Sequence, residues 1–518
     1  MAFCRTPCEP AVANAATGRD SQGARATFWI LAATILGSSL SFLDGTVVTV
    51  VLPIIQQELH ATIVGAQWIV EIYLLFLSSL ILVGGAVGDR LGRERVFTGG
   101  VLAFGISSIG CAFSPSLGVL VVWRALQGIA SAFLIPESLA ILGAAFTPGE
   151  RGRAVGTWSA ASSIVMAGGP ILGGWLAQHT SWRWIFALNV PLAAAVVAIM
   201  WFEVPFSVPH KATRALDWIG ATLITGGLGG IVFGLIESPQ YGLGSLRVVL
   251  SLIIGVALIG AFIVVEDRVI RPLVPLMLFR SRAFSGANLI TLLLYAGLGG
   301  AIFFLPFHLI QVHHYSAAAA GASMLPLVIL MGLLSRFSGE LSERIGITLP
   351  LTIGPLLCAI GIATFALPGA GGSYWVTFFP GMVILGLGLA TTVAPLTTAV
   401  LSAVDDEFEG VASGVNNAVA RLGNLLAIGV LGIIVAQRFS TQLDTALAHA
   451  GASAQVRQTL SAQALQLSAI KPPPGLEHGV AAAAVSAFRA AMIVSAMLAL
   501  VAAGVGATTL PPRRGRRR

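Results

Sequence analysis

Apolar stretches long enough to cross a lipid bilayer recur along this chain from Thr27 to Leu510. A membrane-spanning helix needs about 20 apolar residues, because lipid tolerates only segments whose backbone hydrogen bonds are satisfied internally. A hydropathy window of about 19 residues predicts fourteen spans, and therefore an all-α polytopic membrane protein. The expected spans cover residues 27–53, 66–88, 96–115, 117–145, 154–178, 183–203, 217–237, 247–265, 284–309, 317–338, 347–368, 375–400, 410–436 and 486–508.

The composition excludes several other classes of protein. Only 10% of the 518 residues are charged, whereas about 25% are charged in soluble domains. The net charge of +7 comes mainly from arginines in short loops and at the chain ends, so it does not build the basic face that nucleic-acid binding requires. The sequence has no phosphate-binding glycine loop, and Cys111 and Cys358 lie within apolar runs rather than in a metal-ligand pattern. We expect neither an enzyme nor a bound cofactor.

The distribution of basic residues predicts the orientation. An even number of spans places both termini on one side, which then holds about 21 basic residues against about five on the other, and the positive-inside rule makes that side cytoplasmic. The run after residue 26 is too long for a signal-peptide core and contains Asp44, so residues 1–26 are expected to be a retained cytoplasmic leader. Residues 511–518 form a basic cytoplasmic tail. The preference for Arg over Lys is typical of a GC-rich bacterial genome, which indicates a bacterial inner membrane.

The chain contains an internal repeat. The stretch "GAVGDRLG" from Gly85 to Gly92 is echoed by "GELSERIG" from Gly339 to Gly346, 254 residues later, and Leu-Pro pairs end both the first and the ninth span. Duplicated helical bundles are typical of transporters that expose a central site alternately to each side. The expected parts are a six-helix bundle over 27–203, an inserted helix pair over 204–283, and a second six-helix bundle over 284–510 that includes an extracytoplasmic loop over 437–485.

Four stretches combine charge, glycine and proline at fixed spacing: "LDGTVVTVVLP" from Leu43, "GAVGDRLGRER" from Gly85, "RALQGIASAFLIPES" from Arg124 and "AGGPILGGWL" from Ala167. With these motifs the chain resembles the major facilitator superfamily, and within it the fourteen-spanner drug:proton antiporters of the EmrB/QacA type. The resemblance implies two pseudo-symmetric six-helix bundles plus two inserted helices, and proton-driven export of amphipathic, drug-like compounds. Two alternatives stay open: a transporter of a single metabolite or self-made antibiotic, and a channel.

The resemblance assigns the loop after the second span a mechanical role. Charges at the membrane face can form a latch that breaks when the bundles rock, and glycines let neighbouring helices approach closely, here at Gly85 and Gly88. If the arginines served only as a topology signal, they could lie anywhere in the loop, and the fixed spacing of the glycines and the acid would not be needed. The predicted latch residues are Gly85, Asp89, Arg90, Gly92 and Arg93.

Asp44 and Arg124, which lie in two of these motifs, are the expected proton-coupling residues, and Glu137 is expected to be either a second protonatable site or a site for a cationic substrate. An arginine inside an apolar helix costs about 2.5–3.5 kcal/mol, so it should face a wet cavity or a carboxylate. Asp44 and Arg124 are estimated to differ in depth by only about 6 Å, which permits an ion pair between them. The alternative for these residues is a purely structural salt bridge, and Glu137 is nearly as well explained as a satisfied helix carboxyl. Glu71, near the outer end of the second span, is expected to reach water.

A hinge is expected in the fifth span. The motif residues are Gly169, Pro170, Gly173 and Gly174, where proline removes one backbone hydrogen bond and glycine permits tight packing. Val165 departs from the family pattern, which has glycine at that position, so close packing there is in doubt.

Polar residues within other spans are candidates for lining the cavity, and for those of the thirteenth span interhelical hydrogen bonding is the equal alternative. They are Gln127, Asn189, Asn416, Asn417 and Arg421. The expected partners are protons, a small amphipathic substrate and membrane lipid, without nucleic acid. A periplasmic adaptor is possible for this family, and the sequence carries no signal for one.

Overall fold

The computed structural model describes residues 10–204, 217–269, 272–405, 408–470 and 473–509. Within these ranges thirteen helices are long and apolar enough to cross a membrane, and the remaining predicted span, 347–368, coincides with a shorter apolar helix, Pro350–Thr364. Helices begin at side-chain caps such as Thr62, Asp217 and Ser281, whose oxygens accept hydrogen bonds from the first turn. The predicted all-α membrane architecture is confirmed.

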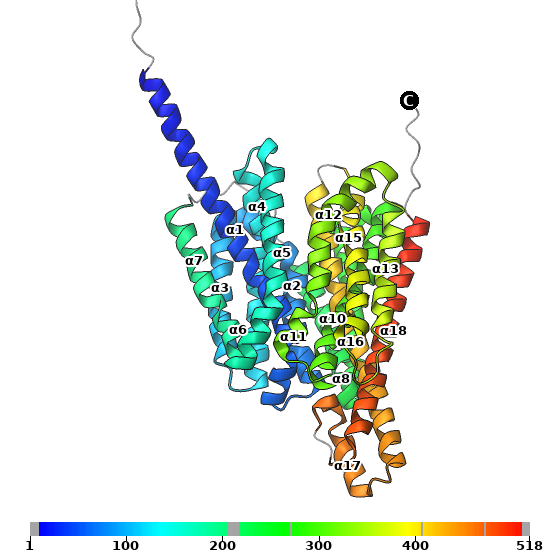
Figure 1. The fold of residues 1–518 in the computed structure, drawn as a ribbon. Helices are drawn as coiled ribbons and strands as arrows, with labels where there is room; N and C mark the ends of the chain where they lie inside the picture. Colours follow the sequence, from blue (N-terminus) through cyan, green and yellow to red (C-terminus); the bar gives the residue numbers. More distant parts are fainter. Residues whose placement is uncertain (1–9, 205–216, 270–271, 406–407, 471–472, 510–518) are drawn as a thin grey trace, which may run out of the picture.

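Figure 1 shows two groups of helices side by side, in the order in which the chain runs. The first group contains α1 (Pro10–Glu58), α2 (Ile63–Leu91), α3 (Arg93–Ala112), α4 (Leu117–Ala145), α5 (Pro148–His179), α6 (Arg183–Ala187) and α7 (Asn189–Phe202). The helices α8 (Trp218–Tyr241) and α9 (Leu246–Arg268) pack on each other, and α8 also contacts α2 and α16, one from each group. The second group contains η1 (Leu276–Arg280), α10 (Arg282–Gln311), α11 (Ala317–Ala322), α12 (Leu325–Ile345), α13 (Pro350–Thr364), α14 (Tyr374–Thr377), α15 (Phe379–Leu401), α16 (Glu409–His449), α17 (Ala454–Ala462), η3 (Ala464–Ala469) and α18 (Glu477–Thr509).

Three predicted spans are each divided into two helices. The span 183–203 is α6 followed by α7, 317–338 is α11 followed by α12, and 375–400 is α14 followed by α15. Both α12 and α15 begin with proline in the first turn, where the missing backbone N–H is not needed. Hydropathy cannot detect such breaks, because the residues on both sides remain apolar.

The segment 437–485 is largely helical. α16 continues unbroken through 41 residues to His449, a length of about 60 Å, which is twice the thickness of the hydrocarbon core. With α17, η3 and the start of α18 it forms a helical cap, which projects at the end of the molecule opposite to the start of α1 and the end of α18 (Figure 1). The described ends of the chain therefore lie on the same side.

The two copies of the repeated loop share a backbone conformation. Gly92 ends α2 with φ of 99°, and Gly346 ends α12 with φ of 89°. Each donates its N–H to the carbonyl oxygen four residues earlier, of Gly88 and Ser342 respectively. Glycine is required at both positions because L side chains rarely adopt this left-handed region. The repeat read from the sequence thus corresponds to a repeated helix end.

Close packing of α2 on α4 depends on Gly84 and Gly88 rather than on Gly85. A Cβ at Gly84 would lie 2.0 Å from the carbonyl oxygen of Ala132, whereas one at Gly85 would make an ordinary contact of 3.8 Å with Pro136. The expectation for Gly85 is therefore wrong, since residues four apart share a helix face and Gly85 points away from that face. A Cβ at Gly88 would meet the carboxyl of Glu137 at 2.1 Å.

Candidate functional site

A buried ion pair joins the first and fourth spans. Nη1 of Arg124 on α4 donates to Oδ2 of Asp44 on α1, and the two side chains are only 1% and 0% exposed. The same guanidinium donates through Nε to the carbonyl oxygen of Ile69 on α2 at 2.9 Å, and through Nη1 to Oε1 of Gln127 at 2.7 Å. Nε2 of Gln127 donates to Oδ1 of Asp44 at 3.2 Å. Three helices therefore meet at one charge pair, as the estimated depths allow.

An uncharged shell surrounds this pair. The ring of Tyr73 lies 4.3 Å from the Arg124 guanidinium carbon, a cation–π geometry, and its hydroxyl hydrogen-bonds to Ser41 at 2.5 Å and to Ser131 at 3.0 Å. Ser108 on α3 accepts from Gln127 at 2.8 Å and from Asn189 at 3.3 Å. The shell thus ties α3 and α7 to the pair and holds the charges away from lipid and water.

Gln127 and Asn189 are therefore not placed as the cavity-lining prediction requires. They are 0% and 1% exposed, and both donate to Ser108 inside the first bundle. A polar side chain within an apolar helix finds its hydrogen bonds either in a cavity or across a helix interface, and here the interface supplies them. Both side chains therefore tie helices together within the first bundle.

Glu137 and Glu71 are buried carboxyl groups of a different kind. They are 1% and 0% exposed, and among the described residues none of their four carboxyl oxygens has a hydrogen-bond partner. Glu137 is thus not a satisfied helix carboxyl, since it packs against Gly88 without a donor. The expectation that Glu71 reaches the outer water is also wrong, because α16 packs over α2 here and the amide of Gln67, one turn away, donates to the carbonyl oxygen of Ile428 at 2.7 Å. The position of Glu71 near the end of its span did not reveal that α16 packs over it.

The predicted latch residues contact the first bundle. Arg93 donates through Nε and Nη2 to Oδ1 of Asp89 at 3.1 and 2.8 Å, and through Nη1 to the carbonyl oxygen of Ala140 on α4 at 3.2 Å. Arg90 is exposed. Arg93 therefore bridges the end of α2 to α4 within the first bundle.

The glycines of the predicted hinge pack against two different partners. A Cβ at Gly173 would lie 2.0 Å from Val47 on α1, and one at Gly169 would lie 3.0 Å from Thr46 on the same helix. A Cβ at Gly174 would instead meet the carbonyl oxygen of Ala317 on α11 at 2.4 Å. In return, a Cβ at Gly321 on α11 would meet the carbonyl oxygen of Pro170 at 2.3 Å. The backbones of α5 and α11, one from each bundle, are therefore in direct contact.

Side-chain hydrogen bonds between the bundles lie toward the end of the molecule that carries the helical cap. Gln67 on α2 donates to Ile428 on α16, and Nε2 of Gln311 on α10 donates to Oε1 of Gln56 on α1 at 3.2 Å. Nε2 of Gln56 donates to the carbonyl oxygen of Gln466 in the helical cap at 3.4 Å. In Figure 1 the ribbons of the two bundles meet near the cap and separate toward the end that carries the termini. The bundles are thus sealed together on the cap side.

Replacing Gly174 with Ala is expected to weaken this seal. The added Cβ would lie 2.4 Å from a backbone oxygen, so the helices would have to separate by about 1 Å, and overpacking of this kind costs about 1–3 kcal/mol. That energy shifts a two-state equilibrium about 5- to 150-fold away from the cap-side-closed state. Thiol labelling of a cysteine introduced beside α11 measures the shift. Gly168→Ala on the same helix, where no atom lies within 4 Å of the added Cβ, is the matched control. Equal labelling of the two variants would contradict the proposed seal.

The three cavity-lining candidates on α16, Asn416, Asn417 and Arg421, differ in their surroundings. Nδ2 of Asn416 donates to Oδ1 of Asn288 at 3.2 Å and to the hydroxyl of Thr291 at 2.7 Å, so this side chain ties α16 to α10. Asn417 is exposed, and Arg421 is half-buried. Asn416 is therefore hydrogen-bonded across the helix interface, whereas Asn417 and Arg421 keep accessible side chains.

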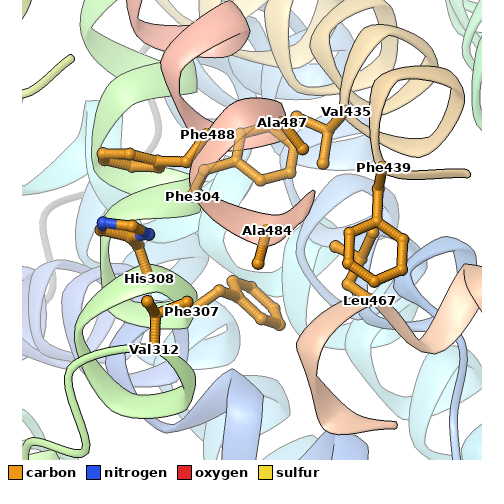
Figure 2. A pocket seen from close by; sticks show the side chains of 10 residues that line it. All are labelled: Phe304, Phe307, His308, Val312, Val435, Phe439, Leu467, Ala484, Ala487 and Phe488. Atoms are coloured by element: carbon orange, nitrogen blue, oxygen red, sulfur yellow. The ribbon is translucent and has the colours of Figure 1, made fainter. Parts of the chain in front are cut away.

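Two cavities lie away from the Asp44–Arg124 pair, and neither reaches its charged groups. A cavity of about 30 Å³ beside the cap is large enough for only one or two waters (Figure 2). Within it the ring of His308 stacks on Phe488 at 4.0 Å, and neither ring nitrogen has a hydrogen-bond partner among the described residues. A larger groove of about 770 Å³ runs between α3 and α4, and its rim includes the exposed Leu91, Ile106 and Leu126, so it opens on the outer surface of the first bundle.

Comparisons with known proteins agree with this architecture. The family model of the Major Facilitator Superfamily matches residues 34–428. A tetracenomycin C resistance and export protein from Streptomyces glaucescens is 32% identical over 500 residues, which are 94% of this chain and 93% of that protein. The multidrug resistance protein Stp from Mycobacterium tuberculosis is 32% identical over 421 residues, 81% of this chain and 78% of that protein. A bacterial homologue of the human lysosomal transporter Spinster, solved in an inward-facing and unoccupied conformation, has a TM-score of 0.65 at 16% identity, with 93% of this chain and 97% of that chain covered.

Proposed function

The chain belongs to the Major Facilitator Superfamily, and from this premise we propose that it is a proton-driven exporter of small amphipathic compounds that works by alternating access. It is a membrane transporter whose relatives are named as drug or antibiotic resistance and export proteins. Within the family we place it among the fourteen-spanner antiporters, because the inserted pair α8 and α9 separates two bundles of similar construction. The proposed location is a bacterial inner membrane with both termini cytoplasmic.

The observation that carries this proposal is the Asp44–Arg124 pair. A carboxylate deep in the membrane is costly and is retained where it moves or holds charge. Asp44 is held by Arg124 and Gln127 from α4 while Arg124 also binds the α2 backbone. A rotation of α1 relative to α4 would break the pair, and the carboxylate would then take up a proton. Re-formation of the pair would expel that proton on the other side. Asp44 thus acts as the proton carrier and Arg124 as the group that displaces the proton, while Glu137, buried without a donor, is a second candidate carrier.

The energy available to such a cycle is sufficient. One proton that crosses 100 mV releases about 2.3 kcal/mol, which supports a gradient of about 50-fold for a neutral solute. The cap-side seal supplies the alternating-access element, since α5 and α11 must part for the cavity to open on that side. With the termini in the cytoplasm, the structure is closed to the exterior.

A transporter of one compound is a second candidate, because the relative that covers 94% of this chain is named for a single antibiotic. Competition separates the two functions. A broad exporter is inhibited by chemically unrelated dyes, whereas a narrow transporter is inhibited by one scaffold only. A channel is tested by counterflow, because only a carrier speeds labelled uptake when unlabelled substrate is present on the far side.

The test of proton coupling is transport in proteoliposomes with an imposed pH step. A panel of dyes and antibiotics is loaded, and flux is followed with and without the step. Export that accelerates when the opposite compartment is acidified supports the antiport mechanism. Flux that is the same at every pH difference would overturn it.

A further inference from the structure

Arg421 is a guanidinium near the centre of the membrane that forms an ion pair with none of the described residues. It lies twelve residues after the start of α16 at Glu409, about 18 Å along the helix and so close to the middle of a hydrocarbon core about 30 Å thick. Its Nε is buried without a hydrogen-bond partner, and none of the ion pairs formed by the described residues includes it. The side chain as a whole is half-buried, so part of it stays accessible.

The face of α16 that carries Arg421 is turned toward the first bundle. Ala418, three residues earlier, packs against the buried cluster that contains Tyr73 and Leu77, and a Cβ at Gly414 would lie 2.7 Å from Leu82 on α2. Residues three and four apart share a helix face. Arg421 also lies within electrostatic range of the phenol groups of Tyr73 on α2 and Tyr295 on α10. It therefore sits between the bundles, where the family architecture places substrate.

The membrane-embedded acids of the first bundle are not accessible to a substrate as a cation site. Asp44 is committed to Arg124, and Asp44, Glu71 and Glu137 are each at most 1% exposed. Compared with these three acids, the half-buried Arg421 is the charged group that a substrate could reach. A guanidinium in this position is costly unless an anion or water satisfies it, and its planar fork matches a carboxylate and stacks on aromatic rings.

We propose that Arg421 is the substrate-recognition residue of this transporter and that it selects planar aromatic anions, such as compounds with a carboxylate or an acidic phenol, over aromatic cations. The Tyr295 phenol on α10 lies within electrostatic range of the guanidinium, and the exposed amide of Asn417, about one turn away, offers a neutral hydrogen-bonding group. This inference rests on the proposed export function and names its substrate class.

Binding of two matched dyes tests the charge preference. Carboxyfluorescein is anionic and rhodamine 123 is cationic, and both have a planar xanthene core. Fluorescence anisotropy of each dye with the purified full-length protein gives the two dissociation constants. A hydrogen-bonded charge contributes about 1.5–3 kcal/mol, so the wild-type protein should bind carboxyfluorescein about 10- to 100-fold more tightly than rhodamine 123. Equal affinity, or a preference for the cation, would overturn the inference.

Variants of Arg421 test whether this residue causes the preference for the anionic dye. Arg421→Gln should remove the difference between the dyes by weakening only carboxyfluorescein, and Arg421→Lys should retain part of it, because the charge remains but the fork is lost. Arg438→Gln, at an exposed arginine in the extramembrane part of the same helix, should leave both affinities unchanged. An unchanged ratio in Arg421→Gln contradicts the assignment. If Arg421→Gln does not fold, the ratio of the two dissociation constants in the wild-type protein and in Arg421→Lys tests the assignment instead.

The same proteoliposome assay keeps this inference separate from the exporter proposal. If the pH step drives rhodamine 123 but the protein shows no preference for the anion, the exporter proposal stands and the role of Arg421 fails. If carboxyfluorescein binds through Arg421 but no pH step drives it, anion recognition stands and proton coupling fails.

Discussion

Asp44→Asn is expected to abolish proton-driven export while the protein still inserts into the membrane, with a lower melting temperature because Arg124 loses its anion. Asparagine nearly matches aspartate in shape and can still accept a hydrogen bond from Arg124, but it cannot carry a proton at any accessible pH. Flux driven by a pH step should therefore fall to that of empty liposomes. Counterflow of substrate without a pH difference should persist in part, because the bundles can still rock. The measurement is dye flux in proteoliposomes at matched protein content.

Asp267→Asn provides the matched control for Asp44→Asn, since it makes the same substitution at an exposed residue of α9. It should transport at the wild-type rate. If Asp44→Asn also exports normally at wild-type expression, the coupling proton resides elsewhere, and Glu137→Gln becomes the decisive variant.

Arg124→Ala should stop transport and also destabilise the protein. The substitution leaves the Asp44 carboxylate buried without its cation, which typically costs about 3–5 kcal/mol. It also removes the guanidinium that binds the Ile69 carbonyl and lies over the Tyr73 ring. The expected result is a lower melting temperature in detergent together with the absence of pH-driven flux.

A double variant separates the two effects of Arg124. Asp44→Asn combined with Arg124→Gln removes both charges, so the stability lost in Arg124→Ala should largely return while transport stays absent. Arg268→Ala, at an exposed arginine of α9, controls for loss of an arginine as such. A fully active Arg124→Ala variant would remove this residue from the mechanism.

The Asp44–Arg124 contact was within reach of the sequence because both charges are isolated in apolar helices. Each needs a partner, and their distances from the helix ends place them at similar depths. The burial of Glu71 was out of reach by the same reasoning. Its position about one turn inside α2 describes its depth but not which helix covers it, and here α16 comes from a part of the chain more than 300 residues away.

Glycine positions illustrate the same limit. The motif identified Gly85 and Gly88 as sites of close approach, but the contact with α4 is made by Gly84 and Gly88. Whether a glycine faces a partner depends on the rotation of the helix about its axis, and a shift of one residue turns the side chain by about 100°. In the fifth span Gly169 and Gly173 do face close neighbours, which are side chains of α1, and only the structure shows that Gly174 faces the backbone of α11 in the other bundle.

The sequence by itself determined the class of protein, the order of the apolar spans and their number to within one, and the charged residues that must find partners in the membrane. These are local properties, since partition between lipid and water depends on the composition of each segment. The tertiary structure decided which carboxyl groups are sealed, that Gln127 and Asn189 bond within one bundle, and that Arg421 stands accessible between the two. Those outcomes depend on how helices distant in sequence rotate and pack against one another, which no single segment encodes.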